Sequence, residues 1–251
     1  TDNPNGFLVL KSNANGDLVA AWVGNNNALS SGSTSQQTIA NVYRPATGWD
    51  GPTALTDSAT AAQGYLTGVA INESGVAAVA YNFTSTTAGS VQRGKISRYT
   101  AGTWGLRTDP ATASTTTLTA SVRIALDAAG LLSAAWSQPG FTAWAAHETA
   151  PGTWDSTAQL SANGELKDVV VDSNGNALAV WIEVGSDGFL SRLKSARLLA
   201  GANVWTSLSG LTGASANPAA FSAEIAVSSN GDIVAAWYDR VTSKPWGNVL
   251  R

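Results

Sequence analysis

The chain has 251 residues, with 14 Lys and Arg against 17 Asp and Glu, so its formal net charge is −3. Such a small negative charge does not favour nucleic acid or an anionic membrane surface, and neither partner is expected. The apolar runs are also far shorter than the roughly 20 residues that span a bilayer, so membrane insertion is not expected. The absence of Cys excludes disulfides, thiolate metal sites and Cys nucleophiles.

The composition is typical of a folded, exported protein. Only 12 % of the residues are charged, while 44 % are hydrophobic and ten are Trp. That much apolar material can offset the entropy lost when the chain becomes ordered, so disorder is not expected. The polar surface must then consist mainly of Ser, Thr, Asn and Gly. We therefore expect a secreted or cell-surface protein.

A hairpin-like motif recurs five times along the chain. The copies are LKSNANGDLVAAW (10–22), INESGVAAVAY (71–81), LDAAGLLSAAW (126–136), VDSNGNALAVW (171–181) and VSSNGDIVAAW (227–237). Each has an Asn, Asp or Ser three residues before a turn glycine and a Trp or Tyr six residues after it. A short polar side chain that opens a turn and a glycine that takes positive φ are typical of a type I turn between two strands. The turn glycines are Gly16, Gly75, Gly130, Gly175 and Gly231.

Each hairpin is followed by a second pair of strand-like segments, in which another Trp recurs just after a turn: Trp49, Trp104, Trp154 and Trp205. Consecutive turn glycines are separated by 45 residues (Gly130 to Gly175) to 59 residues (Gly16 to Gly75). Four short strands repeated at this spacing predict the blades of a β-propeller, and no helical periodicity is present. We predict one all-β domain over 1–251, a five-bladed propeller of four-stranded antiparallel blades at about 5–64, 65–119, 120–164, 165–219 and 220–251.

The aromatic residues thus form two columns: the Trp or Tyr six positions after each turn glycine, and the Trp after each second turn. Both columns are predicted to form the core between blades. The last copy ends near its third strand, so the last blade is expected to lack its outermost strand. An unpaired strand edge is a site where another chain can add. The sequence therefore predicts either a protein partner at that edge or a chain that belongs to a longer repeat protein.

Three charged residues stand seven positions before their turn glycines, at the start of the predicted inner strands: Arg123, Asp168 and Glu224. Inner strands line the channel of a propeller, so these side chains are expected to meet at its rim. The two carboxylates could serve glycoside hydrolysis as a pair, with the arginine holding substrate. The three could instead bind a polar ligand without reaction, or form a neutralising ion cluster. No residue is assigned a catalytic role.

The remaining candidates are weaker. His147 is the only histidine, so a His-based metal site or catalytic triad lacks a second member. The NANGD, DSNGN and SSNGD turns lack the ligand spacing of a calcium loop, so no metal and no cofactor are expected. Trp144 and Trp246 lie outside both aromatic columns and could stack on a sugar ring. The polar loops 23–37 and 82–94 offer amides and hydroxyls for sugar hydroxyls.

The five hairpins resemble the repeats of secreted bacterial β-propellers, a group with lectin-like and sialidase-like members. The sialidase Asp box, S-x-D-x-G-x-x-W, is not matched, because in DSNGNALAVW the Trp follows the glycine by six residues instead of three. Sialidases also carry an arginine triad and a Tyr–Glu pair. At the positions seven residues before the turn glycines, only Arg123 could correspond to a member of these groups. The similarity among the blades is more typical of a repeated binding or scaffold element.

The resemblance and the residues together predict an extracellular recognition domain, most simply a lectin-like, carbohydrate-binding one whose partners are glycans. The alternative is a structural or assembly module of a larger envelope, adhesin or filament protein. A glycoside hydrolase is the third hypothesis, and an activity as an enzyme is left open but not favoured.

Overall fold

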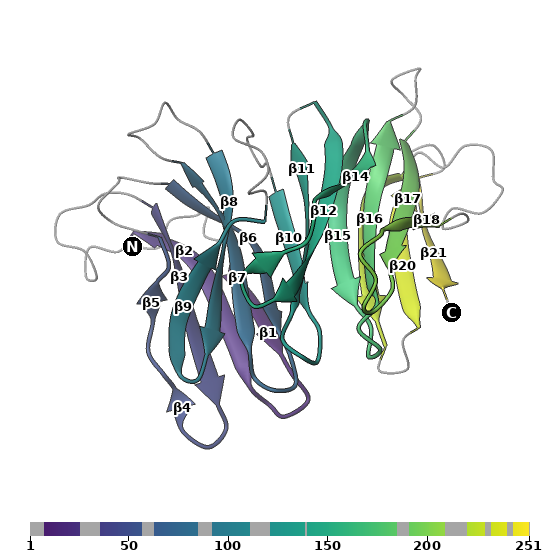
Figure 1. Ribbon diagram of the computed structural model, residues 1–251. Coiled ribbons are helices and arrows are strands. Elements are labelled where there is room, and N and C mark those ends of the chain that lie inside the picture. Colours follow the sequence, from purple (N-terminus) through teal and green to yellow (C-terminus); the bar gives the residue numbers. More distant parts are fainter. Residues whose placement is uncertain are drawn as a thin grey trace. The chain divides into compact units, whose positions relative to one another are not determined.

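The computed structural model describes residues 8–25, 36–56, 63–84, 92–110, 121–138, 140–184, 191–208, 220–228, 232–239 and 243–250. Within these ranges all regular structure is β-strand (Figure 1), as the lack of helical periodicity predicts. No helix in this part of the chain is long and apolar enough to cross a membrane. The chain divides into two compact units, residues 1–130 and 131–251.

The first unit contains two complete antiparallel sheets. The first sheet consists of β1 (Leu8–Ser12), β2 (Leu18–Asn25), β3 (Gln36–Arg44), β4 (Gly48–Trp49) and β5 (Thr53–Ala54). The second consists of β6 (Gln63–Ile71), β7 (Ala77–Thr84), β8 (Gln92–Thr100) and β9 (Thr103–Thr108). The third repeat adds its first strand, β10 (Ser121–Leu126), to this unit. Every strand pairs with its neighbour in sequence except β5, which pairs with β3.

The second unit contains the rest of the third repeat and the last two sheets. The third repeat supplies β11 (Leu132–Gln138), β12 (Thr142–Ala150), β13 (Thr153–Trp154) and β14 (Ala158–Ser161). The fourth sheet consists of β15 (Gly164–Val171), β16 (Ala177–Val184), β17 (Ser191–Leu198) and β18 (Thr206–Leu208). The last has only β19 (Ala220–Val227), β20 (Ile233–Asp239) and β21 (Lys244–Leu250) among the described residues, as predicted.

The hairpin turns have the predicted geometry. Four of the five turn glycines have φ between +77° and +81°: Gly16, Gly75, Gly130 and Gly175. Each of these four donates its backbone N–H to the carbonyl of the residue three positions earlier, at 3.0–3.3 Å. Positive φ is costly for residues with a Cβ, which explains why glycine recurs at this position. Gly231 lies outside the described residues.

The two faces of each sheet pack against different neighbours. Residues two, four and six positions after the turn glycine share one face, which we call the aromatic face because its outermost member is the recurrent Trp or Tyr. Residues three and five positions after the glycine share the other, which we call the aliphatic face. In the first unit, Val19 and Ala21 on the aliphatic face of the first sheet form a buried cluster with Ala77, Val79 and Tyr81 on the aromatic face of the second.

The same arrangement recurs in the second unit. Leu178 and Val180 on the aliphatic face of the fourth sheet form a cluster with Ile233, Ala235 and Trp237 on the aromatic face of the last. The prediction that the hairpin aromatics are core is confirmed for the four that are at most 7 % exposed: Tyr81, Trp136, Trp181 and Trp237. In both of these pairs, the earlier sheet presents its aliphatic face to the aromatic face of the later one.

Side-chain amides also join successive turns of the first unit. The Oδ1 atoms of Asn13 and Asn72 accept backbone N–H bonds within their own turns, from Asp17 (2.9 Å) and Val76 (3.0 Å). Their Nδ2 atoms donate to carbonyls of the next turn, those of Asn72 (2.9 Å) and Asp127 (2.8 Å). One amide thus closes its own turn and fastens it to the following repeat.

We expect Asn72→Asp to lower the free energy of unfolding of the first unit by about 1–3 kcal/mol, the cost of an unsatisfied buried polar group. Asn72 is buried, and an aspartate would keep the bond to Val76 but put an acceptor against the Asp127 carbonyl. Urea unfolding followed by circular dichroism measures the change. Asn15→Asp is the matched control, because its amide bond to the Glu73 carbonyl (2.7 Å) is exposed and its loss should be nearly neutral. Equal effects of the two variants would contradict the inter-turn role.

Candidate functional site

The three predicted rim residues occupy different surroundings. Arg123, in β10 of the first unit, donates to the backbone carbonyl of Thr67 in β6. Asp168, in β15 of the second unit, follows a β-bulge and accepts the backbone N–H of Val169 at 2.8 Å. Glu224, in β19, is exposed. Since the arginine belongs to one unit and the carboxylates to the other, the convergence of the three stays a prediction.

The strand registers place the two carboxylates on corresponding faces of neighbouring sheets. Asp168 lies opposite Val180 and Glu224 opposite Ala236, so each points to the aliphatic face of its own sheet. Asp168 thus faces the last sheet, whereas Glu224 lies on the face of the last sheet directed away from the fourth. Among the described residues, no group of three or more His, Asp or Glu side chains could hold a metal ion.

The two off-column tryptophans differ in exposure. Trp144 is partly buried in β12, opposite Trp136, and its indole N–H donates to the Thr142 hydroxyl at 3.0 Å. Trp246 is 50 % exposed in β21, opposite the buried Trp237. A sugar could therefore reach the ring of Trp246 more readily. Most of the polar loops at 23–37 and 82–94 lie outside the described residues.

His147 takes part in the packing of the third repeat. Its Nδ1 lies 3.0 Å from the hydroxyl of Ser133, which is fully buried, and its backbone N–H donates to Asp155 at 2.8 Å. Burial raises the pKa of the Asp155 carboxyl, and the bond from the His147 backbone partly offsets this. Because the serine is not accessible, the pair cannot act as a nucleophile and base.

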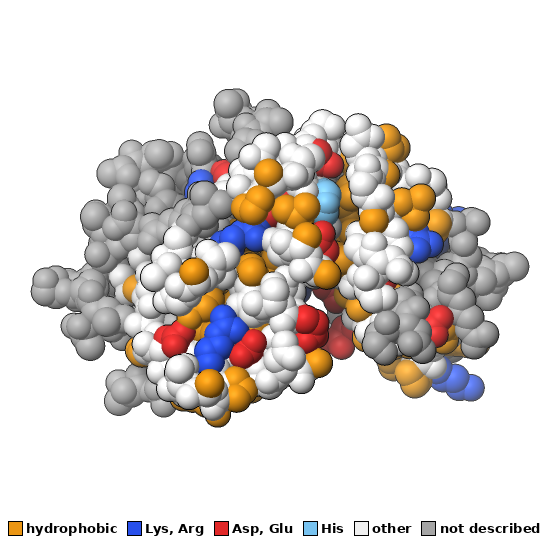
Figure 2. All heavy atoms as spheres, turned by 60° about the horizontal axis from the view of Figure 1, so that its bottom comes forward, with side chains coloured by type: hydrophobic (Ala, Val, Ile, Leu, Met, Phe, Trp, Pro, Cys, Tyr) orange, Lys and Arg blue, Asp and Glu red, His pale blue; other side chains and the backbone are white. Residues whose placement is uncertain are grey.

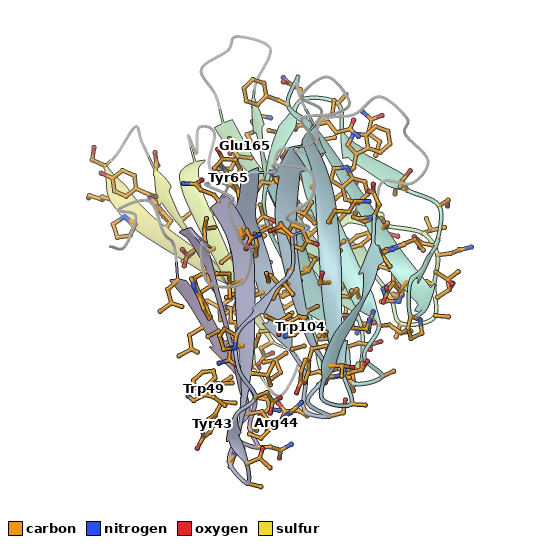
Figure 3. All side chains as sticks on the ribbon, turned by 90° about the vertical axis from the view of Figure 1, so that its left-hand side faces the viewer. Tyr43, Arg44, Trp49, Tyr65, Trp104 and Glu165 are labelled. Carbon is orange, nitrogen blue, oxygen red and sulfur yellow. The ribbon has the colours of Figure 1, made fainter. Side chains whose placement is uncertain are left out.

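A Tyr–Trp pair recurs at the ends of the outer strands of the first unit. The rings of Tyr43 and Trp49 have centroids 5.4 Å apart at 58°, and those of Tyr99 and Trp104 have centroids 5.3 Å apart at the same angle. Figure 3 shows Tyr43, Arg44 and Trp49 together at one end of the first sheet. Trp49 is 49 % exposed, so the prediction that this aromatic column is inter-blade core is wrong for this residue. It lies beyond the packed area, on a two-residue edge strand.

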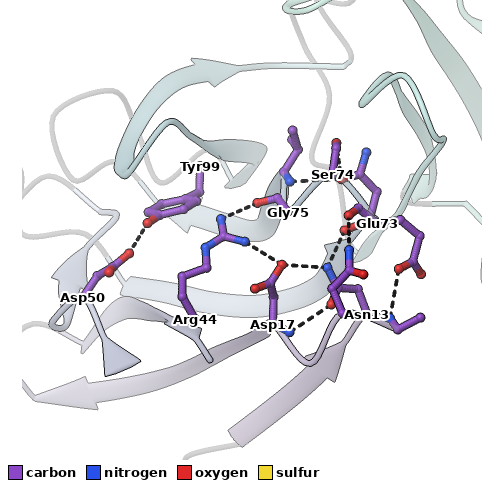
Figure 4. A network of polar contacts seen from close by, with 12 residues as sticks. Asn13, Asp17, Arg44, Asp50, Glu73, Ser74, Gly75 and Tyr99 are labelled. Atoms are coloured by element: carbon purple, nitrogen blue, oxygen red, sulfur yellow. Dashed lines mark hydrogen bonds and ion pairs between the residues drawn. The ribbon is translucent and has the colours of Figure 1, made fainter. Parts of the chain in front are cut away.

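Arg44 connects this pair to the turns of both sheets (Figure 4). Its Nη1 is 2.8 Å from the Asp17 carboxylate, and its Nη2 donates to the Gly75 carbonyl at 2.7 Å. The guanidinium carbon also lies 5.5 Å from the centroid of the Tyr99 ring, within cation–π range. A Cβ on Gly75 would require this guanidinium to shift, and the positive φ of the residue favours glycine independently.

The Tyr99 hydroxyl donates to the carboxylate of Asp50, the residue after Trp49. Burial raises the pKa of Tyr99, and the hydrogen bond to Asp50 and its negative charge raise it further, while Arg44 acts in the opposite direction. The phenol is therefore a neutral donor at neutral pH. Asp50 itself is exposed, which leaves further lone pairs of its carboxylate open to a ligand.

We call these five residues (Tyr43, Arg44, Trp49, Asp50 and Tyr99) the Trp49 surface. It combines an exposed indole with a carboxylate that the neighbouring sheet holds in position. Figure 2 shows basic and acidic side chains side by side among hydrophobic ones on this face of the first unit. Trp49 shares the face of its strand partner Tyr43, whereas Asp50 turns to Tyr99 of the second sheet, so the indole and the carboxylate lie on different sides of the first sheet. The indole can cover the apolar side of a ring, and the carboxylate can accept hydroxyls. Sequence reasoning missed the surface because it assigned Trp49 to the core.

No protein-family model matches the chain, and no curated protein matches it in sequence. Solved structures do resemble it. The α-L-arabinanase of Penicillium chrysogenum, complexed with arabinobiose, has a TM-score of 0.55 at 13 % identity over 95 % of this chain and 78 % of its own. The Aleuria aurantia lectin, a six-bladed β-propeller with a fucose recognition mode, has a TM-score of 0.52 at 13 % identity over 97 % of this chain and 76 % of its own.

A Hadza microbial sialidase has a TM-score of 0.52 at 12 % identity over 86 % of this chain. The chain spans about half of the length of that sialidase and about three quarters of the length of the other two structures. At these identities the likeness concerns the fold alone. The chain has the all-β fold of a β-propeller, built from five antiparallel blades of which the last has three described strands, and the fold prediction is confirmed.

Proposed function

We propose that this protein is an extracellular carbohydrate-binding β-propeller, and that the Trp49 surface is its sugar-binding site. The observations that support this are the exposed Trp49 ring and the exposed carboxylate of the following residue, Asp50, which accepts the Tyr99 hydroxyl. The indole can cover the apolar side of a pyranose or furanose ring. The carboxylate can accept two neighbouring sugar hydroxyls, and Arg44 offsets its charge from the other side of Tyr99.

The surface is better suited to binding than to hydrolysis. A glycosidase needs two carboxyl groups on either side of the scissile bond, separated by roughly 5–10 Å. The network contains two further carboxylates: Asp17 is paired with Arg44 at 2.8 Å, and Glu73 accepts the backbone N–H of Ala14 at 3.0 Å. Both are thus bound to groups of the turns. The rim residues Arg123, Asp168 and Glu224 are the second proposed location for a sugar, and the one where hydrolysis would be sought. Trp246 is a third proposed contact, as an isolated stacking ring.

We expect the purified chain to bind defined oligosaccharides on a broad glycan array and Trp49→Ala to weaken this binding at least tenfold, which corresponds to about 1.4 kcal/mol. Asp50→Asn should weaken it less, because an amide keeps one acceptor. Phe141→Ala is the matched control, since that ring is 56 % exposed and lies in the other unit. The affinities are compared by titration calorimetry with the best glycan.

The other outcomes separate the hypotheses. Binding that survives Trp49→Ala but is lost in an Asp168→Ala, Glu224→Ala double variant would move the site to the rim, and turnover of the bound glycan would then identify a hydrolase. Loss of binding only in Trp246→Ala would move it to the last sheet. The absence of any glycan binding by the folded chain would contradict carbohydrate recognition and favour an assembly module.

A further inference from the structure

Asn–Gly pairs can lose ammonia without an enzyme, because the backbone nitrogen of the glycine can attack the side-chain Cγ of the asparagine. Glycine favours this step, since it has no Cβ to hinder the approach. The step also needs an asparagine amide that is free to rotate and a glycine N–H that can leave its hydrogen bond. The described residues contain three such pairs: Asn15–Gly16, Asn163–Gly164 and Asn174–Gly175. The pairs at 5–6 and 230–231 lie outside the described residues.

The Asn163–Gly164 pair is held by the sheet. Gly164 is buried at the start of β15, and its backbone N–H donates to the Phe141 carbonyl. The packing there is so close that a Cβ would displace the buried Trp181 ring. The nitrogen that would have to attack is therefore both bonded and covered, and we expect this pair to react slowly.

The other two pairs lie in hairpin turns with the same backbone. Gly16 has φ of +81° and Gly175 has φ of +80°. Each donates its N–H to the carbonyl three positions earlier, at 3.3 Å in the first repeat and 3.0 Å in the fourth. The two turns are thus a matched pair, which differ in the contacts that the asparagine and its neighbours make.

The turn of the first repeat is fastened to the turn of the second. The Asn15 amide donates to the Glu73 carbonyl at 2.7 Å, and the backbone N–H of Ala14 donates to the Glu73 carboxylate at 3.0 Å. The Asn13 amide adds a bond to the Asn72 carbonyl at 2.9 Å. The first of these bonds must break before the amide of Asn15 can rotate, and the other two resist opening of the turn.

The turn of the fourth repeat leaves its asparagine free. Asn174 is exposed, and its side-chain amide has no hydrogen-bond partner among the described residues, whereas its backbone N–H donates to Asp172 Oδ1 at 2.9 Å. The strands that contact the fourth sheet on its two sides, β11, β12 and β19, belong to the same unit. Only the hydrogen bond from Gly175 to the Asp172 carbonyl has to open before the glycine nitrogen can attack.

We propose that Asn174 is a site of spontaneous deamidation in the folded protein. The Gly175 nitrogen forms a bond to the Asn174 Cγ and loses its proton, while the bond from Cγ to Nδ2 breaks and ammonia leaves. The product is a cyclic imide. Water then opens the ring at either of its two carbonyls, which gives aspartate or isoaspartate. Both products add a negative charge to the turn.

Isoaspartate also changes the main chain, which then passes through the side-chain carbons and is longer by one atom. The turn depends on its present length, because the Asp172 carboxylate accepts the backbone N–H groups of Asn174 (2.9 Å) and Asn176 (2.8 Å) while its carbonyl accepts that of Gly175 (3.0 Å). A longer main chain cannot keep all three bonds. Isoaspartate at position 174 therefore loosens the hairpin between β15 and β16.

The test is peptide mapping by mass spectrometry after storage of the folded chain at mildly alkaline pH. Asn174 lies in the tryptic peptide 168–192, which contains no other Asn–Gly pair. We expect conversion about tenfold faster at Asn174 than at Asn15 or Asn163, because hydrogen bonds must first break at those two sites. In urea the three rates should become similar. Conversion of Asn15 or Asn163 as fast as that of Asn174 in the folded chain would overturn the proposal, and so would an unreactive Asn174 in a chain that reacts once unfolded.

Asn174→Ser is the matched variant, since the second repeat has Ser74 at this position and keeps the turn, with φ of +77° at Gly75. Its urea midpoint should not change on storage, whereas that of the wild type should fall as isoaspartate accumulates. Asn174→Asp adds the charge without lengthening the main chain, so its midpoint should stay near that of the fresh wild type. A stored wild type that is converted at Asn174 but keeps its midpoint would contradict the loosening of the turn.

Discussion

Replacing Trp181 by Ala is expected to lower the free energy of unfolding of the second unit by about 3–5 kcal/mol, the usual cost of deleting a buried aromatic side chain. Trp181 is 3 % exposed and forms a cluster with Ala143 and Ala196. Its indole also lies so close to Gly164 that a Cβ at that glycine would collide with the ring. Leu160 and Trp205 also pack against this cluster, but both are only partly buried, so we expect them to fill little of the space left by the indole.

Trp181→Phe separates the contribution of the ring from that of its N–H group. The indole Nε1 is buried and has no hydrogen-bond partner among the described residues. Phenylalanine removes this unsatisfied donor and keeps most of the apolar contact, so its cost should be less than half that of alanine. Urea unfolding of both variants provides the comparison. An alanine variant within about 1 kcal/mol of the wild type would mean that the ring is not part of the core.

The repeat is the part of the fold that the sequence predicts best. A glycine with positive φ, a polar residue three positions before it and an aromatic residue six positions after it have strict local requirements, which do not depend on distant contacts. The positive φ of Gly16, Gly75, Gly130 and Gly175 follows from those requirements. The aromatic position is buried in four of the five repeats, and Trp22 is the partly exposed exception. Strand pairing then follows, because within each repeat every strand pairs with its neighbour in sequence except β5 and β14, which pair with β3 and β12.

The candidate site was harder to predict, because it depends on contacts between repeats. Arg44 reaches Asp17 in its own sheet and Gly75 in the next, 31 residues further along the chain. The residues around Trp49 do not indicate that this side chain is exposed, whereas Trp104, at the equivalent position of the second repeat, is partly buried. The sequence does contain a pattern that predicts these ring pairs: a Tyr is followed by a Trp six residues later in the first repeat (Tyr43, Trp49) and five residues later in the second (Tyr99, Trp104). In the structure both pairs have nearly the same ring geometry.

Replacing Glu148 by Ala is expected to destabilise the second unit by about 3 kcal/mol or more, since each lost hydrogen bond to a charged group costs about 1.5–3 kcal/mol. Glu148 is fully buried in β12. Its Oε2 accepts the backbone N–H of Leu132 at 3.0 Å, and its Oε1 accepts that of Gly152 at 2.8 Å. One carboxylate thus satisfies a strand donor and a turn donor that alanine would leave without a partner.

Glu148→Gln tests whether the two acceptors act separately. Its amide oxygen can replace one carboxylate oxygen, but its NH₂ group would face the second backbone N–H, so we expect about half of the loss that alanine causes. Glu165→Ala is the control, because its side chain is 51 % exposed and its ion pair with Lys167 (2.7 Å) should contribute less than about 1 kcal/mol. Urea midpoints rank the three variants. A glutamine variant as stable as the wild type would show that water satisfies one of the two backbone donors. The negative charge of Glu148 would then not be needed to connect β11 with the turn between β12 and β13.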